Sequence, residues 1–134
     1  MSSDKTQIVR AGAVMRKEVQ SIDGMATVKE AVAMMRAHHV SALLVEKRHP
    51  DDAWGIITVH DMVLKVILPG RSSDEVNVYE VMTKPVITVP VDMDVRYVAR
   101  LLSRAGIRRA PVEDGKKLVG MISLSSLVLD NDLF

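Results

Sequence analysis

The stretch Gly55-Ile56-Ile57-Thr58-Val59-His60-Asp61 decides the fold, because the chain writes it a second time as Gly120-Met121-Ile122-Ser123-Leu124-Ser125-Ser126. In both copies a glycine opens a short apolar run, the run stops at a hydroxyl residue, and a helical pattern follows. This pattern predicts a strand that leads into a helix whose start can hold a phosphate. The two copies differ at one informative position: Asp61 in the first is replaced by Ser126 in the second.

The repeat extends over most of the chain. The segment Val14-Met15-Arg16-Lys17 is answered by Val81-Met82-Thr83-Lys84, and Thr27 opens a helical pattern that Asp94 opens again. Both Thr27 and Asp94 are residue types that commonly cap helices. Each unit of about fifty residues therefore predicts the order strand, helix, strand, turn, strand, helix. In the second unit Asp114-Gly115 predicts a hairpin turn.

These elements predict an α+β fold in which two β-α-β-β-α repeats pack sheet to sheet with pseudo-twofold symmetry, because neither repeat has enough apolar residues to stand alone. The expected divisions are an N-terminal leader or arm at 1–13, a first repeat at 14–68, a linker at 69–76 and a second repeat at 77–134. Within the arm, residues 1 to about 7 are polar, and the following residues are compatible with a short helix.

Composition excludes several functional classes. The 134 residues are 48% hydrophobic and 26% charged, with a net charge of +1 that gives no reason to expect nucleic acid or an anionic membrane as a partner. There is no cysteine, no apolar signal segment and no run long enough to span a bilayer, so we expect a cytoplasmic protein. No catalytic motif, nucleotide-binding glycine motif or metal-ligand spacing appears, and we predict no enzymatic activity and no metal site.

The doubled motif in register over residues 14–130 resembles a tandem CBS domain pair, also called a Bateman module. This resemblance implies a regulatory module that binds an adenine nucleotide or related adenosyl ligand (AMP, ADP, ATP, NAD or S-adenosylmethionine) in clefts between the repeats. It also implies a homodimer and a regulated protein partner of unknown identity, and no catalytic cofactor.

The chemistry of a first site follows from Asp61, because a carboxylate can accept hydrogen bonds from both hydroxyls of a ribose. Thr58 lies where its hydroxyl can meet a phosphate at the helix start. The resemblance implies that the other repeat supplies the adenine pocket, with Ile107 against the base and a pair of arginines near the phosphates. The expected ligand-binding residues are Ile57, Thr58, Asp61, Val89, Pro90, Ile107, Arg108 and Arg109.

A second, weaker site is expected from the other copy of the motif. Its residues are Ser123, Ile22, Val40, Ser41 and Ala42. Because Ser126 replaces the carboxylate, the charged hydrogen bonds to a ribose are missing there.

Other interpretations of the same residues stay open. Thr58-x-x-Asp61 is also close to a capping box, in which the pair only satisfies the helix start, and Ser123 has the same structural interpretation. The alternative function is a non-catalytic scaffold or dimerisation module that acts through a protein partner without a nucleotide. A third hypothesis is nucleic-acid binding through the arginine-rich face between Arg96 and Arg109, which we do not expect because acidic residues elsewhere balance the charge.

Overall fold

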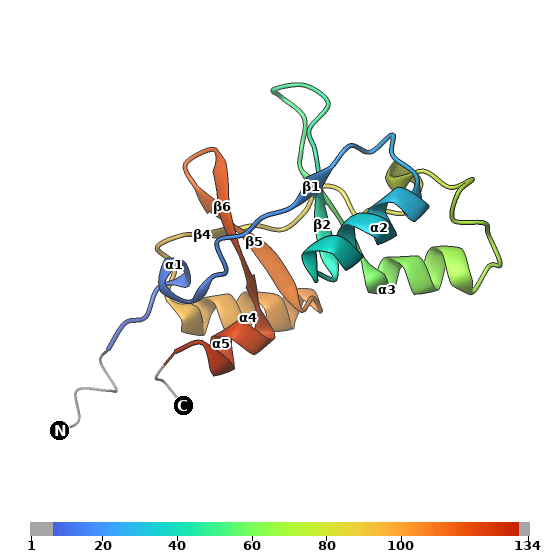
Figure 1. Ribbon diagram of the computed structural model, residues 1–134. Coiled ribbons are helices and arrows are strands. Elements are labelled where there is room, and N and C mark those ends of the chain that lie inside the picture. Colours follow the sequence, from blue (N-terminus) through green and yellow to red (C-terminus); the bar gives the residue numbers. More distant parts are fainter. Residues whose placement is uncertain (1–6, 132–134) are drawn as a thin grey trace. The chain divides into compact units, whose positions relative to one another are not determined.

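The computed structural model describes residues 7–131, which form two compact units (Figure 1). One unit comprises Gln20–Val86, and the other combines residues 7–19 with residues 87–131. Of the polar leader predicted at residues 1 to about 7, residues 1–6 lie outside the described residues. Within residues 7–131 no helix has the length and apolar character that crossing a membrane requires.

The Gln20–Val86 unit is a small sheet with helices. Its elements are β1 (Ser21–Ile22), α2 (Val28–His38), β2 (Ala42–Val45), β3 (Gly55–Thr58), α3 (Val59–Met62), the π-helical turn η2 (Val63–Ile67) and the 3₁₀ turn η3 (Val78–Glu80). The strand order is β1-β2-β3, with β1 parallel to β2 and β2 antiparallel to β3. The predicted order of elements is confirmed.

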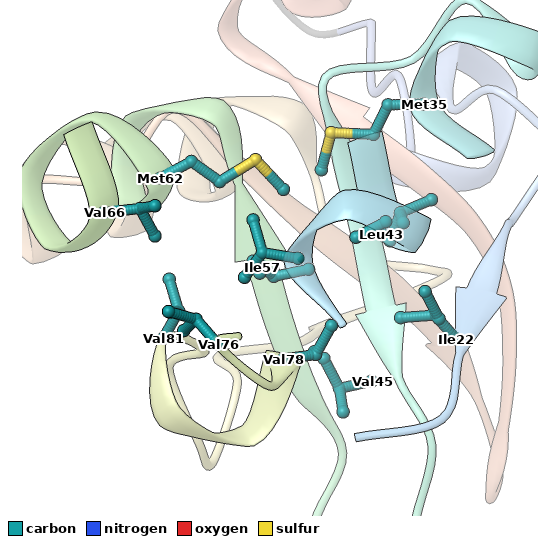
Figure 2. Packing of buried hydrophobic residues seen from close by; sticks show 12 residues of the cluster. Ile22, Met35, Leu43, Val45, Ile57, Met62, Val66, Val76, Val78 and Val81 are labelled. Atoms are coloured by element: carbon teal, nitrogen blue, oxygen red, sulfur yellow. The ribbon is translucent and has the colours of Figure 1, made fainter. Parts of the chain in front are cut away.

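The core of this unit lies between the sheet and its helices (Figure 2). Leu43 and Ile57 are paired across β2 and β3, and both side chains are fully buried. Because neighbouring strand residues point to opposite faces, Leu43, Val45 and Ile57 share the face that packs on Met35 of α2 and on Met62 of α3. Every position of β2 is buried, as the continuous apolar run predicts.

The second unit repeats this plan. Its elements are α1 (Ala11–Val14), β4 (Val89–Pro90), α4 (Val95–Ala105), β5 (Arg109–Asp114), β6 (Lys117–Ser123) and α5 (Leu124–Leu129). The strand order is β4-β5-β6, with the same parallel and antiparallel pairings as in the first sheet. The predicted hairpin is confirmed, with Gly115 at a φ of 65° in the turn between Asp114 and Lys117.

The helix starts are capped as predicted. The Thr27 hydroxyl accepts a hydrogen bond from the Glu30 N–H at 3.1 Å, and Asp94 accepts one from the Arg96 N–H at 2.9 Å. Both α2 and α4 have 11 residues and end at a residue in the left-handed region, His39 or Gly106. The two helices are therefore equivalent elements of the repeat.

The segment that opens each sequence repeat pairs with the last strand of the other repeat. Arg16 and Met121 exchange two backbone hydrogen bonds of 2.8 Å, and Thr83 and Ile56 exchange two of 2.8 and 2.9 Å. The sequence repeats and the compact units are therefore different divisions of the chain, because the segments around residues 16 and 83 belong to one repeat by sequence and pack with the other.

Candidate functional site

Asp61 is held at the start of α3 by a capping box with Thr58. Its Oδ2 accepts hydrogen bonds from both the N–H and the hydroxyl of Thr58, each at 2.9 Å, and the Asp61 N–H donates to the Thr58 hydroxyl at 3.1 Å. Within residues 7–131, Oδ1 of Asp61 accepts no hydrogen bond, and the residue is partly exposed. The capping interpretation of the motif is thus confirmed, and the carboxylate keeps one oxygen available for a ligand.

The backbone around Asp61 is fixed by the strand that precedes it. Thr58 pairs with Ala42 across β2 and β3, and the Val59 N–H donates to the Ser41 carbonyl at 3.1 Å. The start of β2 therefore lies beside the start of α3. Ser41 is exposed and Thr58 is partly exposed at this edge of the unit.

The equivalent position of the second repeat is chemically different. Ser126 is 1% exposed, and its hydroxyl accepts a hydrogen bond from the Ser123 N–H at 2.9 Å and donates one to the Ser123 carbonyl at 2.8 Å. The hydroxyl of Ser126 thus serves the helix start alone. No carboxylate stands at this position, and the capping interpretation of Ser123 is confirmed.

Arg108 and Arg109 lie at the start of β5, in the place that Ser41 and Ala42 take in the first repeat. The Arg108 carbonyl accepts a hydrogen bond from the Leu124 N–H at 2.9 Å, and Arg109 pairs with Ser123. Arg108 is exposed and Arg109 is half-buried. Burial, together with the nearby charge of Arg108, lowers the pKa of the Arg109 guanidinium, so an anion that approaches this pair relieves an unfavourable cluster of positive charge.

The remaining predicted site residues differ in how far their side chains are exposed. Ile57 and Val89 are completely buried in the cores of their own units, and Ile22 and Ala42 are also buried. Their side chains are therefore not available to a ligand. Val40 and Ile107 are half-buried, and Pro90 is exposed.

A groove lies within the Gln20–Val86 unit, between α2 and the helical segment Val59–Ile67. It has a volume of about 550 Å³. Its lining is almost entirely apolar and consists of Val28, Val32, Met35, Arg36, Val40, Val59, Met62, Val63, Val66, Ile67 and Ser73. Of the predicted site residues it includes only Val40. The sequence did not reveal this groove, because its residues read as an ordinary core-facing helix pattern.

The rim of this groove is exposed, and the same positions are exposed in the other repeat. Val59, Val63 and Leu64 are 47%, 37% and 48% exposed, and their equivalents Leu124, Val128 and Leu129 are 39%, 45% and 77% exposed. Both repeats therefore keep apolar side chains on the outer side of the last helix. Within residues 7–131 no group of three or more His, Asp or Glu side chains could hold a metal ion.

The family model of the CBS domain matches residues 11–67 and 78–129. The chain belongs to the CBS domain family. CBS domains are usually regulatory ligand-binding modules without catalytic activity, and the tandem α+β repeats described above are the fold of this family.

Similar proteins extend the CBS assignment. An uncharacterised protein of Methanopyrus kandleri is 36% identical over 121 residues, and the mitochondrial CBS domain-containing protein CBSX3 of Arabidopsis thaliana is 36% identical over 125 residues. These matches cover 90% and 86% of this chain and 61% of each relative. The chain thus spans less than two thirds of the length of these relatives.

Two solved structures show the same CBS pair. The hexameric CBS-CP12 protein from bloom-forming cyanobacteria is 42% identical, with a TM-score of 0.89 over 93% of this chain and 72% of that chain. A conserved Pyrococcus horikoshii protein is 28% identical, with a TM-score of 0.80 over 90% of this chain and 89% of that chain.

Proposed function

We propose that this CBS pair is a regulatory module that binds an adenosyl ligand, and that Asp61 holds the ribose. One observation carries the proposal: Asp61 is fixed through Oδ2, while Oδ1 accepts no hydrogen bond within residues 7–131. A carboxylate oriented in this way forms strong, charge-assisted hydrogen bonds with the two hydroxyls of a ribose. CBS domains commonly bind adenosyl ligands, which supports this chemistry.

We assign the phosphates of the ligand to Arg108 and Arg109 rather than to Thr58. The hydroxyl proton of Thr58 is donated to Asp61, so this residue orients the carboxylate and has no proton to offer a phosphate. Guanidinium groups bind phosphate oxygens in a bidentate manner. The adenine ring would lie against Ile107, with the backbone at Val89 and Pro90 reading its polar edge.

The second site, which would combine Ser123 with Ile22, Val40, Ser41 and Ala42, is proposed to be weaker. Ser126 is neutral, is 1% exposed, and uses its hydroxyl within the capping box. A ribose there would gain no charged acceptor. The ligand acts by shifting an equilibrium between conformations, and it does so only to the extent that it binds one of them more tightly.

The second part of the proposal is that the protein self-associates. Self-association is also what the alternative function, a scaffold that needs no nucleotide, would require. The exposed apolar rim at Val59, Val63 and Leu64 recurs at Leu124, Val128 and Leu129. Exposed apolar patches of this kind are typical of interaction surfaces. A homodimer is the smallest assembly that would cover them, and the hexameric CBS-CP12 protein is an example of a larger one.

Calorimetric titration with AMP, ADP, ATP, NAD and S-adenosylmethionine tests the proposal. We expect at least one ligand to bind, and Asp61→Ala to weaken it about ten- to hundredfold, which is the loss expected for charged hydrogen bonds worth about 1.5–3 kcal/mol. Ser126→Ala is the matched control at the equivalent position and should leave the affinity unchanged. Absence of binding by every ligand in the panel, with the protein folded and self-associated, would instead support the scaffold.

A further inference from the structure

The exposed face of α4 carries a row of three arginines, two of which have no charged counterpart on the sister helix α2. Arg96, Arg100 and Arg104 are spaced four residues apart and all three are exposed. Four residues of helix advance about 6 Å, so the three side chains form one row along a single face. Between residues 95 and 112 the chain has five arginines and no acidic residue.

The sister helix α2 provides an internal comparison. It has the same length, and Ala33 and Ala37 occupy the positions of Arg100 and Arg104. Ala33 and Ala37 are exposed too. Because the same helix forms in the same fold with alanine at these positions, the arginines are not required for folding. Their presence in only one repeat indicates a role specific to that unit.

The surroundings of Arg100 and Arg104 leave their charge exposed. The Arg100 guanidinium lies 5.5 Å from the centre of the Tyr97 ring, which fixes its direction. Within residues 7–131 neither Arg100 nor Arg104 belongs to an ion pair. Arginine rather than lysine at every cationic position of α4 suits recognition of carboxylates, because the planar guanidinium binds a carboxylate in a bidentate manner.

We propose that this arginine row is the docking surface for an acidic segment of a partner protein, whose Asp or Glu side chains recur at helical spacing. Charge complementarity and the matching repeat of about 6 Å support a helical acidic segment as the occupant. Nucleic acid fits less well. The one aromatic side chain of α4, Tyr97, has Arg100 over its ring, whereas single-stranded nucleic acid is usually bound by stacking bases on open aromatic rings.

Fluorescence anisotropy at low salt tests the proposal with a labelled helical peptide of alanine with glutamate at every fourth position. The protein variants are R100A/R104A, which copies the sister helix, and K116A/K117A, which removes two exposed charges from the hairpin turn of the same unit. We expect R100A/R104A to weaken binding at least about fivefold, as two exposed ion pairs predict, and K116A/K117A to change it less than twofold. R100Q/R104Q provides the same test with a different side chain, and circular dichroism checks the fold of each variant.

Three results would overturn the inference: no binding of the peptide at low salt, equal weakening by the arginine and lysine variants, or tighter binding of a labelled single-stranded or duplex DNA of equal charge through the same arginines. The first would show that the surface has no affinity for acidic helices. Equal weakening by the arginine and lysine variants would show that the peptide binds through general charge attraction and not through the arginine row. The third would assign the surface to nucleic acid, with the steep salt dependence that counterion release produces.

Discussion

Asp61 binds Thr58 through a single carboxylate oxygen: Oδ2 accepts both the N–H and the hydroxyl of Thr58 at 2.9 Å. In the second repeat, by contrast, the hydroxyl of Ser126 both accepts from and donates to the backbone of Ser123. One position of the repeat thus has a carboxylate with one oxygen outside the capping box, while its equivalent has a neutral hydroxyl that serves only the helix start. This asymmetry underlies the proposal of one strong and one weak site.

Removing the hydroxyl of Thr58 should affect both stability and ligand binding. Thr58→Val deletes a helix cap, which costs about 1 kcal/mol of unfolding free energy, and removes one of the two hydrogen bonds that orient the Asp61 carboxylate. We expect weaker binding of the adenosyl ligand in calorimetry. Ser123→Ala is the matched control, since it deletes the equivalent cap; a similar stability loss without a change in affinity at the Asp61 site is expected. Equal effects of both variants on affinity would contradict the role given to Thr58.

The glycine that opens each motif allows another segment to approach the strand closely. A Cβ on Gly120 would lie 2.8 Å from the Arg16 carbonyl oxygen, whereas one on Gly55 would have its nearest neighbour, the Met82 sulfur, at 3.1 Å. Gly120→Ala should therefore lower the unfolding free energy by about 1–3 kcal/mol, and Gly55→Ala by less. Urea denaturation measures both. Gly24→Ala is the control, because its Cβ would meet its nearest atoms at 3.5 Å. A larger loss for Gly24→Ala than for Gly120→Ala would refute this explanation.

The ion pair between Lys84 and Asp52, 2.6 Å long, should make stability sensitive to acid. The hydrogen bond from Lys84, followed by that from the Arg48 N–H, lowers the pKa of Asp52 below its ordinary value. Because the folded-state pKa is the lower one, this contribution is complete above about pH 4 and is lost as the pH falls below that value.

The Asp52→Asn variant should accordingly show a smaller loss of thermal stability than the wild type between about pH 4 and pH 2. Thermal unfolding followed by circular dichroism at stepped pH provides the measurement. Asp51→Asn removes a neighbouring carboxylate that lacks this ion pair, and its curve should follow the wild type. Parallel curves for Asp52→Asn and the wild type would show that the pair contributes nothing.

The apolar rim beside the groove should govern self-association. Val59 and Leu64 are 47% and 48% exposed, and replacing both with glutamine removes apolar surface without emptying the core. We expect a lower assembly mass or a higher dissociation constant in analytical ultracentrifugation. Met25→Gln, at a position that is 57% exposed outside the helices, should leave the assembly unchanged. An assembly unaffected by the double substitution would place the interface elsewhere.

Much of the fold follows from local sequence signals. The repeated glycine-apolar-hydroxyl motif predicted both strand-to-helix junctions, and the caps at Thr27 and Asp94 form as expected. The sequence did not predict that the segments around residues 16 and 83 each pack with the other repeat. Pairing of Arg16 with Met121, and of Thr83 with Ile56, is set by long-range packing, and nothing in the local pattern of these residues indicates their partners.

The site was only partly visible for the same reason. The type and spacing of Thr58 and Asp61 predicted a helix cap, because a capping box joins two residues three positions apart. The carboxylate of Asp61 also predicted a contact with a ribose. Val89 was expected to be a ligand-binding residue, but its side chain is completely buried in its own unit. Its apolar character is explained by packing, and a sequence pattern does not separate a residue that packs in a core from one that lines a site.

A double-mutant cycle on the ribose is the most direct test. The best ligand of the panel and its 2′-deoxy analogue are titrated by calorimetry into the wild type and into Asp61→Ala. If Asp61 holds the ribose, loss of the hydroxyl should weaken binding to the wild type about tenfold and binding to Asp61→Ala hardly at all, because the partner is already missing. An equal loss in both proteins would show that Asp61 does not contact the sugar and would contradict the proposed site.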